Sequence, residues 1–193
     1  MPSFSDPWLH PWLPAISARS TTSPVLEIGC GHGDDTAVLA DAGLRVIAFD
    51  LSRAAVAAAR LRVPSAQIEC RDIRAPFPPQ ASELGAVIAS LSLHYFPWDE
   101  TVSIVQRIRD AMRPGGWLLC RLNSTEDHNF GAGQGVRIEE NYYSVDGQPK
   151  RFFDEEAVCR LFDGQWQRVS MTHQRTRKYV RSKALWEVVV ERV

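Results

Sequence analysis

The residues best suited to chemistry in this sequence are three acids, a glycine triplet and one histidine. Glu27 stands two residues before Gly29, which opens a run with glycine at every second position. Asp50, Asp72 and His94 each follow a later apolar stretch. Carboxylates accept hydrogen bonds from hydroxyl and amino groups, and imidazole exchanges a proton near neutral pH. These residues therefore suit the binding of a nucleoside-containing ligand beside a candidate general base.

The glycine-rich stretch at residues 25–36 predicts a ligand loop. An apolar run ends in Gly29, Cys30, Gly31 and Gly33, and a helical pattern follows at once. Glycine permits backbone angles that a Cβ forbids and lets a ligand approach the main chain. In open α/β sheets, ligands bind beside such turns at the carboxyl ends of strands. The alternative is a turn that needs glycine only for its own geometry.

The residues after the glycines argue against a phosphate-bearing ligand. No lysine completes the phosphate-cradling motif, and the third glycine of the dinucleotide fingerprint would fall on Asp34 or Thr36. Asp34 and Asp35 suit a helix N-terminus but repel a pyrophosphate. A ligand without phosphates fits better, and a cationic ligand is compatible with the acids. S-adenosylmethionine (SAM) is such a ligand, with a sulfonium, an amino acid end and a nucleoside.

The composition is that of an ordinary globular protein with one core. The chain has 193 residues, of which 45% are hydrophobic and 23% charged, and its net charge is −1. This balance gives no field that would attract nucleic acid or a membrane surface. There is no signal-peptide pattern and no apolar run near the roughly 20 residues of a membrane helix. Four scattered cysteines indicate reduced thiols. We expect a single cytoplasmic domain over residues 1–193, monomeric or homodimeric, without a metal site or a nucleic-acid partner.

The element pattern predicts a parallel sheet. Apolar stretches that read as strands alternate with helical patterns, which implies βαβ units. The carboxyl ends of such strands gather on one edge of the sheet, so the glycine loop, Asp50, Asp72, residues 90–95 and Asn123 should meet there. The expected strands are residues 25–28, 45–49, 67–70, 86–90 and 117–122, and the expected helices are residues 36–42, 54–62 and 99–112.

Two segments lie outside this pattern. The N-terminal arm (residues 1–24) has four prolines in its first 14 residues, which predict that it holds no long helix. Its tryptophans either cover a core edge or cap the mouth of the ligand site. The insertion (residues 123–151) is polar and glycine-rich, as in a functional lid or a disordered segment, and its aromatic residues favour a lid. After it we expect a helix at 154–162 and strands at 166–173 and 184–190, with a basic connector at 175–181 that is either a solvated turn or an anion site.

Several of the polar residues have more than one interpretation. Asp50 either binds both ribose hydroxyls or caps the next helix. Asp72 either accepts from an adenine amino group, with the Ile73 N–H facing a ring nitrogen, or closes a turn. His94 is either the general base, if the acceptor arrives protonated, or a packed residue beside the cofactor.

Five stretches resemble the motifs of class I SAM-dependent methyltransferases, of the compact kind that acts on small molecules. They cover residues 25–122 in the order and spacing of that family. One departure is that Leu84-Gly85-Ala86 stand where the family often has an acid before the fourth strand. The stretches are residues 25–33 (VLEIGCGHG), 49–52 (FDLS), 71–73 (RDI), 90–95 (SLSLHY) and 112–117 (MRPGGW).

The resemblance implies a doubly wound α/β fold whose seven-stranded sheet is mostly parallel and ends in an antiparallel C-terminal hairpin. It implies methyl transfer from SAM, leaving S-adenosylhomocysteine, to an N, O, S or C nucleophile of a small molecule. His94 is the catalytic candidate. The implied cofactor residues are Glu27, Gly29, Cys30, Gly31, Gly33, Asp50, Leu51, Asp72, Ile73 and Ser90. Candidates on the substrate side are Tyr95, His128, Tyr142, Tyr143 and Arg151.

Three alternatives stay open from the sequence. One is an NAD(P)-linked Rossmann oxidoreductase, against which Asp34 at the glycine position argues. The second is a SAM-binding module without turnover. The third is methylation of nucleic acid or protein, which the charge near neutrality disfavours and the basic residues 175–183 favour.

Overall fold

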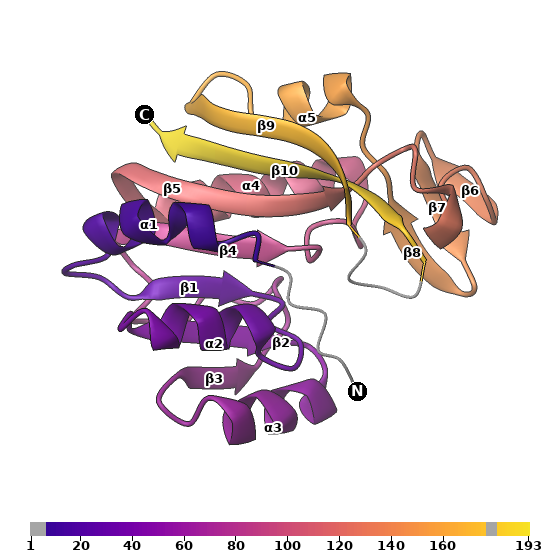
Figure 1. The fold of residues 1–193 in the computed structure, drawn as a ribbon. Helices are drawn as coiled ribbons and strands as arrows, with labels where there is room; N and C mark the ends of the chain where they lie inside the picture. Colours follow the sequence, from indigo (N-terminus) through magenta and orange to yellow (C-terminus); the bar gives the residue numbers. More distant parts are fainter. Residues whose placement is uncertain (1–6, 177–180) are drawn as a thin grey trace.

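The apolar strands assemble into one twisted sheet with the order β3-β2-β1-β4-β5-β10-β9 (Figure 1). We describe residues 7–176 and 181–193 of a computed structural model. Strands β1 to β5 run parallel, and β10 is antiparallel to both of its neighbours, β5 and β9. The sheet confirms the doubly wound fold with its antiparallel C-terminal hairpin. Its strands are β1 (Val25–Ile28), β2 (Val46–Asp50), β3 (Gln67–Cys70), β4 (Leu84–Ser90), β5 (Met112–Asn123), β9 (Trp166–Thr176) and β10 (Lys183–Arg192).

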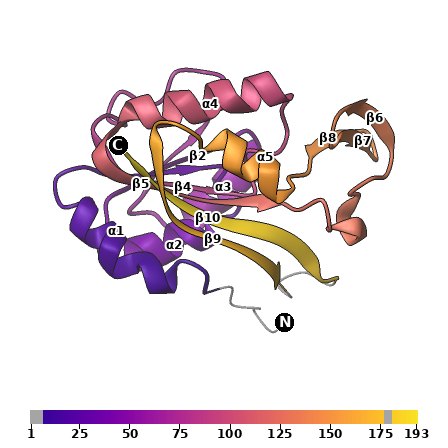
Figure 2. The same cartoon turned by 90° about the horizontal axis from the view of Figure 1, so that it is seen from above.

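Helices cover both faces of the sheet, as Figure 2 shows from above. Buried side chains of the first three helices pack on one face, and those of the last two pack on the other. In the two described ranges, no helix is long and apolar enough to cross a membrane. The helices are α1 (Leu13–Arg19), α2 (Asp34–Asp41), α3 (Arg53–Arg62), α4 (Trp98–Ala111) and α5 (Glu155–Leu161).

The strand and helix bounds differ from expectation mainly at two turns. Strand β5 starts at Met112 instead of 117, because Met112 pairs with Leu84 across an irregularity in the ladder. Strand β9 continues to Thr176, so the first part of the expected basic connector is strand. Arg175 there pairs with Glu126 at 3.0 Å. The rest of that connector, residues 177–180, lies outside the described residues.

The described part of the arm lies against the sheet. A short 3-10 turn, η1 (His10–Trp12), leads into α1, and each has a proline in its first turn. Proline is tolerated there because those N–H groups have no helical partner. Within residues 7–24, the longest helix is α1 with seven residues, which agrees with the prediction that the arm holds no long helix. Trp8 and Leu9 are buried in the core cluster on this face.

Gly85, which lies in β4, accounts for the departure from the family pattern noted at residues 84–86. A Cβ on Gly85 would lie 1.7 Å from the carbonyl oxygen of Arg19, at the end of α1. The Gly85 N–H also donates to the Ser23 hydroxyl at 3.0 Å. Since any side chain would push the end of α1 off the sheet, this position serves the packing of the arm.

The insertion forms a small sheet of its own, which the sequence did not lead us to expect. Strands β6 (Val136–Glu139), β7 (Tyr142–Val145) and β8 (Gln148–Arg151) are antiparallel. The turn between β7 and β8 is Asp146-Gly147, and both residues have positive φ, as in a type I′ hairpin. The two ends of the insertion are joined, because the Phe153 N–H donates to the Asn123 carbonyl at 2.8 Å.

Candidate functional site

The glycine loop lies at the carboxyl end of β1. Its backbone packs closely against Ser92 at Gly29 and is uncovered at Gly31. Gly29 has φ +74, and a Cβ there would lie 2.5 Å from the Ser92 Cβ. Gly31 has φ +53, and a Cβ there would meet no atom within 4 Å. Gly29 therefore permits the contact between the loops after β1 and β4, while Gly31 leaves main chain accessible to a ligand.

Asp50 at the end of β2 faces this loop. One carboxylate oxygen accepts from the Gly31 N–H at 2.9 Å, and the other accepts from the Ser52 N–H at 2.8 Å. Ser52, in turn, caps α3 with its hydroxyl. A carboxylate has about four lone-pair sites, so roughly two remain for a pair of hydroxyl groups. Leu51 beside it is 69% exposed and offers an apolar surface to a ligand.

Glu27 and Cys30 lie beneath the loop. The Glu27 carboxylate is buried and accepts from the Thr36 hydroxyl at 2.5 Å. Burial and the nearby Asp35 carboxylate raise the pKa of Glu27 to about 8, because both disfavour its charged form. Burial also raises the pKa of the Cys30 thiol to about 12, so this cysteine is unreactive at neutral pH.

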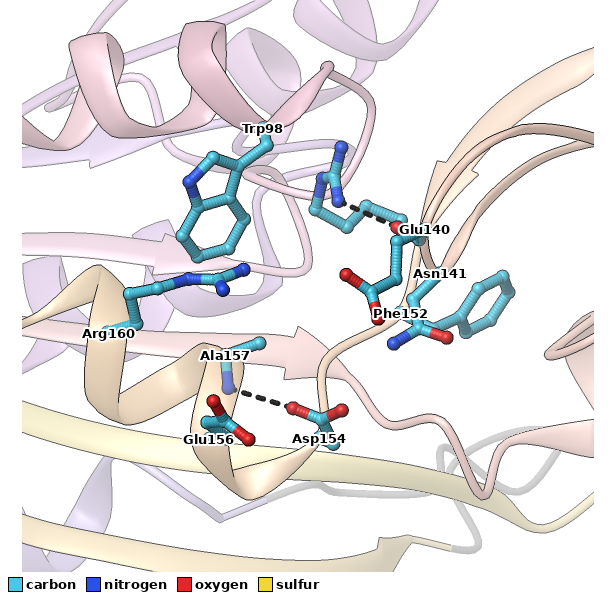
Figure 3. A pocket seen from close by; sticks show the side chains of 9 residues that line it. Trp98, Glu140, Asn141, Phe152, Asp154, Glu156, Ala157 and Arg160 are labelled. Carbon is cyan, nitrogen blue, oxygen red and sulfur yellow. Dashed lines mark hydrogen bonds between the residues drawn. The ribbon is translucent and has the colours of Figure 1, made fainter.

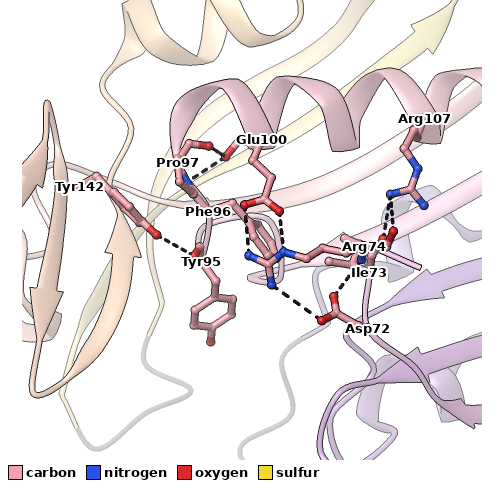
Figure 4. A network of polar contacts seen from close by, with 10 residues as sticks. Asp72, Ile73, Arg74, Tyr95, Phe96, Pro97, Glu100, Arg107 and Tyr142 are labelled. Atoms are coloured by element: carbon pink, nitrogen blue, oxygen red, sulfur yellow. Dashed lines mark hydrogen bonds and ion pairs between the residues drawn. The ribbon is translucent and has the colours of Figure 1, made fainter. Parts of the chain in front are cut away.

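Asp72 belongs to a polar network after β3, drawn in Figure 4. It accepts from the Arg74 N–H at 2.8 Å, and its other oxygen lies 3.7 Å from the Arg74 guanidinium. Arg74 reaches across to Glu100 on α4 at 2.5 Å. The Ile73 carbonyl accepts from Arg107 at 3.1 Å. The loop after β3 is thus fixed to α4, with the Asp72 side chain 38% exposed and accessible to a ligand.

The segment after β4 carries Ser90, His94 and Tyr95. The Ser90 hydroxyl accepts from the Arg121 guanidinium at 2.9 Å. The Tyr95 ring is 42% exposed, and its centroid lies 4.1 Å from that of His94. The Tyr95 carbonyl accepts from the Tyr142 hydroxyl at 2.9 Å (Figure 4). The segment therefore contacts β5 through Ser90 and the insertion through Tyr95.

His94 is buried at this junction. Burial is the main cause that lowers its pKa to about 3, and the ammonium groups of Lys183 and Lys150 add to the effect. A general base works best with a pKa near the operating pH, so these surroundings do not suit the base predicted at His94. Its Nδ1 atom has no hydrogen-bond partner in the part of the chain that the structure describes.

Arg151, a predicted substrate residue, is occupied inside the protein. Its guanidinium donates to the carbonyls of Phe96 at 3.1 Å and Glu140 at 3.2 Å, and also to the Glu139 carboxylate. Its side chain is only 4% exposed. These contacts anchor the insertion to the start of α4. A cavity of about 110 Å³ opens beside this anchor, away from the glycine loop, and Trp98 and Arg160 form one wall of it (Figure 3).

The other substrate candidates lie in the insertion. Tyr143 packs near the Phe152 ring, with centroids 6.3 Å apart. His128 contacts the Ala132 carbonyl through Nδ1 at 3.3 Å. Their role toward a substrate, like that of Tyr95, Tyr142 and Arg151, stays a prediction.

Comparison with known proteins shows which proteins share this sequence pattern and this geometry. A family model described as "Methyltransferase domain" matches residues 25–116. A trans-aconitate 2-methyltransferase from Paracidovorax citrulli is 32% identical over 136 residues, which span 59% of this chain and 51% of that protein. A SAM-dependent methyltransferase from Methanosarcina mazei superposes with a TM-score of 0.76 at 16% identity, covering 93% of this chain and 97% of that one. Residues 25–116 match a methyltransferase domain, and the fold is that of class I methyltransferases.

A second solved structure adds the cofactor side of the comparison. The 1,6-didemethyltoxoflavin-N1-methyltransferase from Burkholderia thailandensis, which holds S-adenosylhomocysteine, has a TM-score of 0.70 at 19% identity. The alignment covers 96% of this chain and 78% of that one. This chain spans about half the length of the curated relatives it matches.

The residues of the methyltransferase domain fit SAM as the cofactor. The open main chain at Gly31 and the two free acceptor sites of Asp50 lie side by side, as a nucleoside requires. Asp72 and Leu51 lie at the ends of the neighbouring strands. Asp34 and Asp35 are held by Arg62 and Trp8 and place negative charge at the start of α2, which suits a cationic ligand and not a pyrophosphate. These observations favour SAM over a dinucleotide.

Three features of this edge escaped the sequence analysis. Trp8 of the arm donates to Asp35 at the start of α2. Arg121 is buried near the end of β5, and its guanidinium lies 4.6 Å from the Trp8 ring. Lys183 was assigned to the basic connector, but it begins β10 and forms a buried ion pair with Asp127 at 2.7 Å. The sequence signal for Lys183 was weak, because a lysine two residues after Arg181 is typical of a charged surface segment.

Proposed function

We propose that this chain transfers the methyl group of SAM to an N, O, S or C nucleophile of a small molecule. The observation that carries the proposal is the pairing of Gly31 with Asp50. An open backbone beside a carboxylate with unused acceptor sites forms one half of a nucleoside site. The family match over residues 25–116 supports the same reading.

The chain's own residues would bind and align the reactants. SAM, when bound, supplies an electrophilic methyl group on a sulfonium. Asp50 accepts from the ribose hydroxyls, and Asp72 with Ile73 addresses the adenine. Glu27 lies beneath the loop and ionises as the cationic cofactor binds, because the sulfonium favours its charged form. Since the methyl group is already activated, the protein contributes mainly proximity, alignment and exclusion of water.

The small size of the substrate is supported by charge and by the relatives. A net charge of −1 gives no general attraction for nucleic acid. The relative from Paracidovorax citrulli is named for trans-aconitate, and the Burkholderia thailandensis structure holds 1,6-didemethyltoxoflavin. The chain acts, in this proposal, as one domain over residues 1–193. Its arm caps the cofactor, and its insertion closes over the substrate as a lid.

Calorimetry with SAM, S-adenosylhomocysteine and NAD tests the cofactor half of the proposal. We expect both sulfur-containing ligands to bind and NAD not to bind. Binding of NAD without SAM would overturn the proposal in favour of an oxidoreductase. Formation of S-adenosylhomocysteine in the presence of trans-aconitate, used as the first acceptor, tests turnover. SAM binding without turnover on any acceptor of a broad panel would leave a binding module instead.

The cellular setting is part of the same proposal. We place the chain in the cytoplasm as a monomer or homodimer, without a nucleic-acid or membrane partner. Light scattering on the purified full chain measures its mass in solution, and a mass above that of a dimer would contradict this part. Retention of the protein on DNA, RNA or lipid vesicles at physiological salt would contradict the rest.

A further inference from the structure

Cationic side chains gather where the insertion meets the carboxyl ends of β4 and β5 and the amino end of β10. Lys183 is 7% exposed, and its ammonium lies 2.7 Å from the Asp127 carboxylate and 4.6 Å from the Phe130 ring. Lys150 and Arg121 both act on Lys183 to lower its pKa, after the larger effect of burial. Lys150 directly precedes Arg151, whose N–H donates to the His94 carbonyl at 2.6 Å, so β8 brings Lys150 to this edge of the sheet. Arg121 lies on β5, which pairs with the strand that Lys183 begins.

Lys150 is the available cation of this group. Its ammonium makes no hydrogen bond or ion pair within residues 7–176 and 181–193, whereas Lys183 is held by Asp127. Lys150 lies on β8 and pairs in register with Tyr143 on β7. The insertion thus carries an uncommitted positive charge to the end of the sheet.

Two buried polar atoms at the same place have no partner in the described chain. They are Nδ1 of His94, a residue 5% exposed, and Oδ1 of Asn123, a residue 2% exposed. Both residues contact the Arg151 backbone: its N–H donates to the His94 carbonyl at 2.6 Å, and its carbonyl accepts from the Asn123 amide at 3.5 Å. Buried polar atoms in proteins nearly always have a partner. A polar ligand between the insertion and the sheet would provide one.

We infer that the methyl acceptor is a small carboxylic acid, held by the Lys150 ammonium and a ring N–H of His94, and that the product is its methyl ester. This inference rests on the proposed function and names the substrate class of that same site. The cations attract an anion and repel a protonated amine. A carboxylate is also ionised at neutral pH, so it needs no general base. That agrees with the neutral, weakly basic imidazole of His94.

The step balances without a proton. One carboxylate oxygen forms a bond to the methyl carbon as the carbon–sulfur bond breaks, and that bond's electron pair stays on sulfur. The negative charge of the acid and the positive charge of the sulfonium disappear together. The other oxygen keeps its hydrogen bonds to Lys150 and His94. The products are a neutral methyl ester and a neutral thioether end on S-adenosylhomocysteine.

Methyl esters can be distinguished chemically from other methylation products. The full chain is incubated with tritium-labelled SAM and with succinate, fumarate, citrate or tricarballylate. Imidazole, catechol and dithiothreitol serve as nitrogen, oxygen and sulfur comparators. We expect label on one or more acids, released as volatile methanol by mild alkali. Label in alkali-stable products alone would overturn the carboxylate inference while methyl transfer stands. If no acid accepts label, the carboxylate inference is also overturned. Calorimetry with SAM then tests separately whether the chain binds the cofactor.

Charge variants on the insertion test the role of Lys150. We expect Lys150→Gln to raise KM for the acid about ten-fold or more, through loss of one charge-assisted hydrogen bond, with the affinity for SAM unchanged. Lys150→Arg should restore most of the loss. Arg137→Gln removes an exposed cation from β6 of the same insertion and should leave KM unchanged. Equal KM values for Lys150→Gln and Arg137→Gln would contradict the assignment.

Discussion

The indole N–H of Trp8 lies 3.0 Å from one carboxylate oxygen of Asp35 and 3.1 Å from the other. This contact ties the N-terminal arm to the first turn of α2, directly after the glycine loop. Asp35 is also one of the groups that raise the pKa of Glu27. The arm is therefore coupled to the cofactor edge of the sheet through Trp8 and Asp35.

Replacing Trp8 by phenylalanine tests that coupling. The variant keeps an aromatic ring over Arg121 but removes one hydrogen-bond donor from a buried carboxylate. We expect a loss of about 1–3 kcal/mol in the free energy of unfolding and weaker SAM binding. Urea unfolding and calorimetry measure the two effects. Trp12→Phe, which changes an indole that packs against Trp117, is the matched control, and equal SAM affinities in the two variants would contradict the coupling.

Asp50 should contribute more to SAM binding than to folding. Asp50→Ala removes the acceptors for the ribose hydroxyls, and each charge-assisted hydrogen bond is worth about 1.5–3 kcal/mol. Because Asp50 also holds the Gly31 and Ser52 N–H groups, Asp50→Asn serves as the milder variant. We expect SAM affinity to fall in the order wild type, Asn, Ala, with far-ultraviolet circular dichroism unchanged. Unchanged affinity in the alanine variant would remove Asp50 from the site.

Glu27 should make SAM binding depend on pH. Its pKa in the folded chain is about 8 against 4.5 for a free side chain, so the folded state binds the extra proton and its stability falls as pH rises from 4.5 to 8. The carboxylates of Asp35, Asp34 and Asp50 and the Thr36 hydroxyl surround it. A cationic ligand favours the ionised form, so SAM should bind more tightly as pH rises toward 8 and should release a proton on binding.

Calorimetry in buffers of different ionisation heat measures that proton. We expect its release by wild-type protein at pH 7 and no release by Glu27→Gln. Proton release of equal size in both proteins would assign it to another group.

Gly85 should be intolerant of even one methyl group. The Cβ of Gly85→Ala would lie 1.7 Å from the Arg19 carbonyl, so α1 or β4 must move at a cost of about 1–3 kcal/mol. Gly147→Ala, where a Cβ meets nothing within 4 Å, isolates the cost of a positive φ. The midpoint temperature of thermal unfolding should fall more in Gly85→Ala than in Gly147→Ala. The reverse order would show that the arm can move away from β4 at little cost.

Arg151 should hold the insertion in place. Arg151→Gln loses the donors to Phe96, Glu140 and Glu139. We expect faster hydrogen exchange over residues 136–151 and a turnover rate that falls more than SAM affinity does. Arg160→Gln, which removes a cation stacked on Trp98 at 4.2 Å, is the control. Unchanged exchange in Arg151→Gln would mean that packing alone anchors the insertion.

Local sequence could predict the first half of the site because each residue there closes its own strand. Gly31, Asp50 and Asp72 follow apolar runs, and a parallel sheet brings strand ends together whatever the details of packing. The helix caps Ser52 and Asp154 also act over three residues and were accessible in the same way.

The second half depends on contacts between distant segments. Trp8 meets Asp35 across 27 residues, and Lys183 meets Asp127 across 56. The helix and strand periodicities of the sequence do not indicate contacts between residues so far apart. The environment of His94 is set by Lys150 and Lys183 on other strands, so a base predicted from residue type alone did not suit its surroundings. The β7–β8 hairpin was missed, although Asp146-Gly147 between two short strands is a recognisable turn signal.

The bond between the Phe153 N–H and the Asn123 carbonyl returns the chain to the point where the insertion left it. A segment that begins and ends at one place can be shortened, lengthened or exchanged without moving the strands on either side. The residues predicted to face SAM all precede it along the chain. Acceptor choice can therefore change when the insertion alone is replaced, while the predicted cofactor site stays the same.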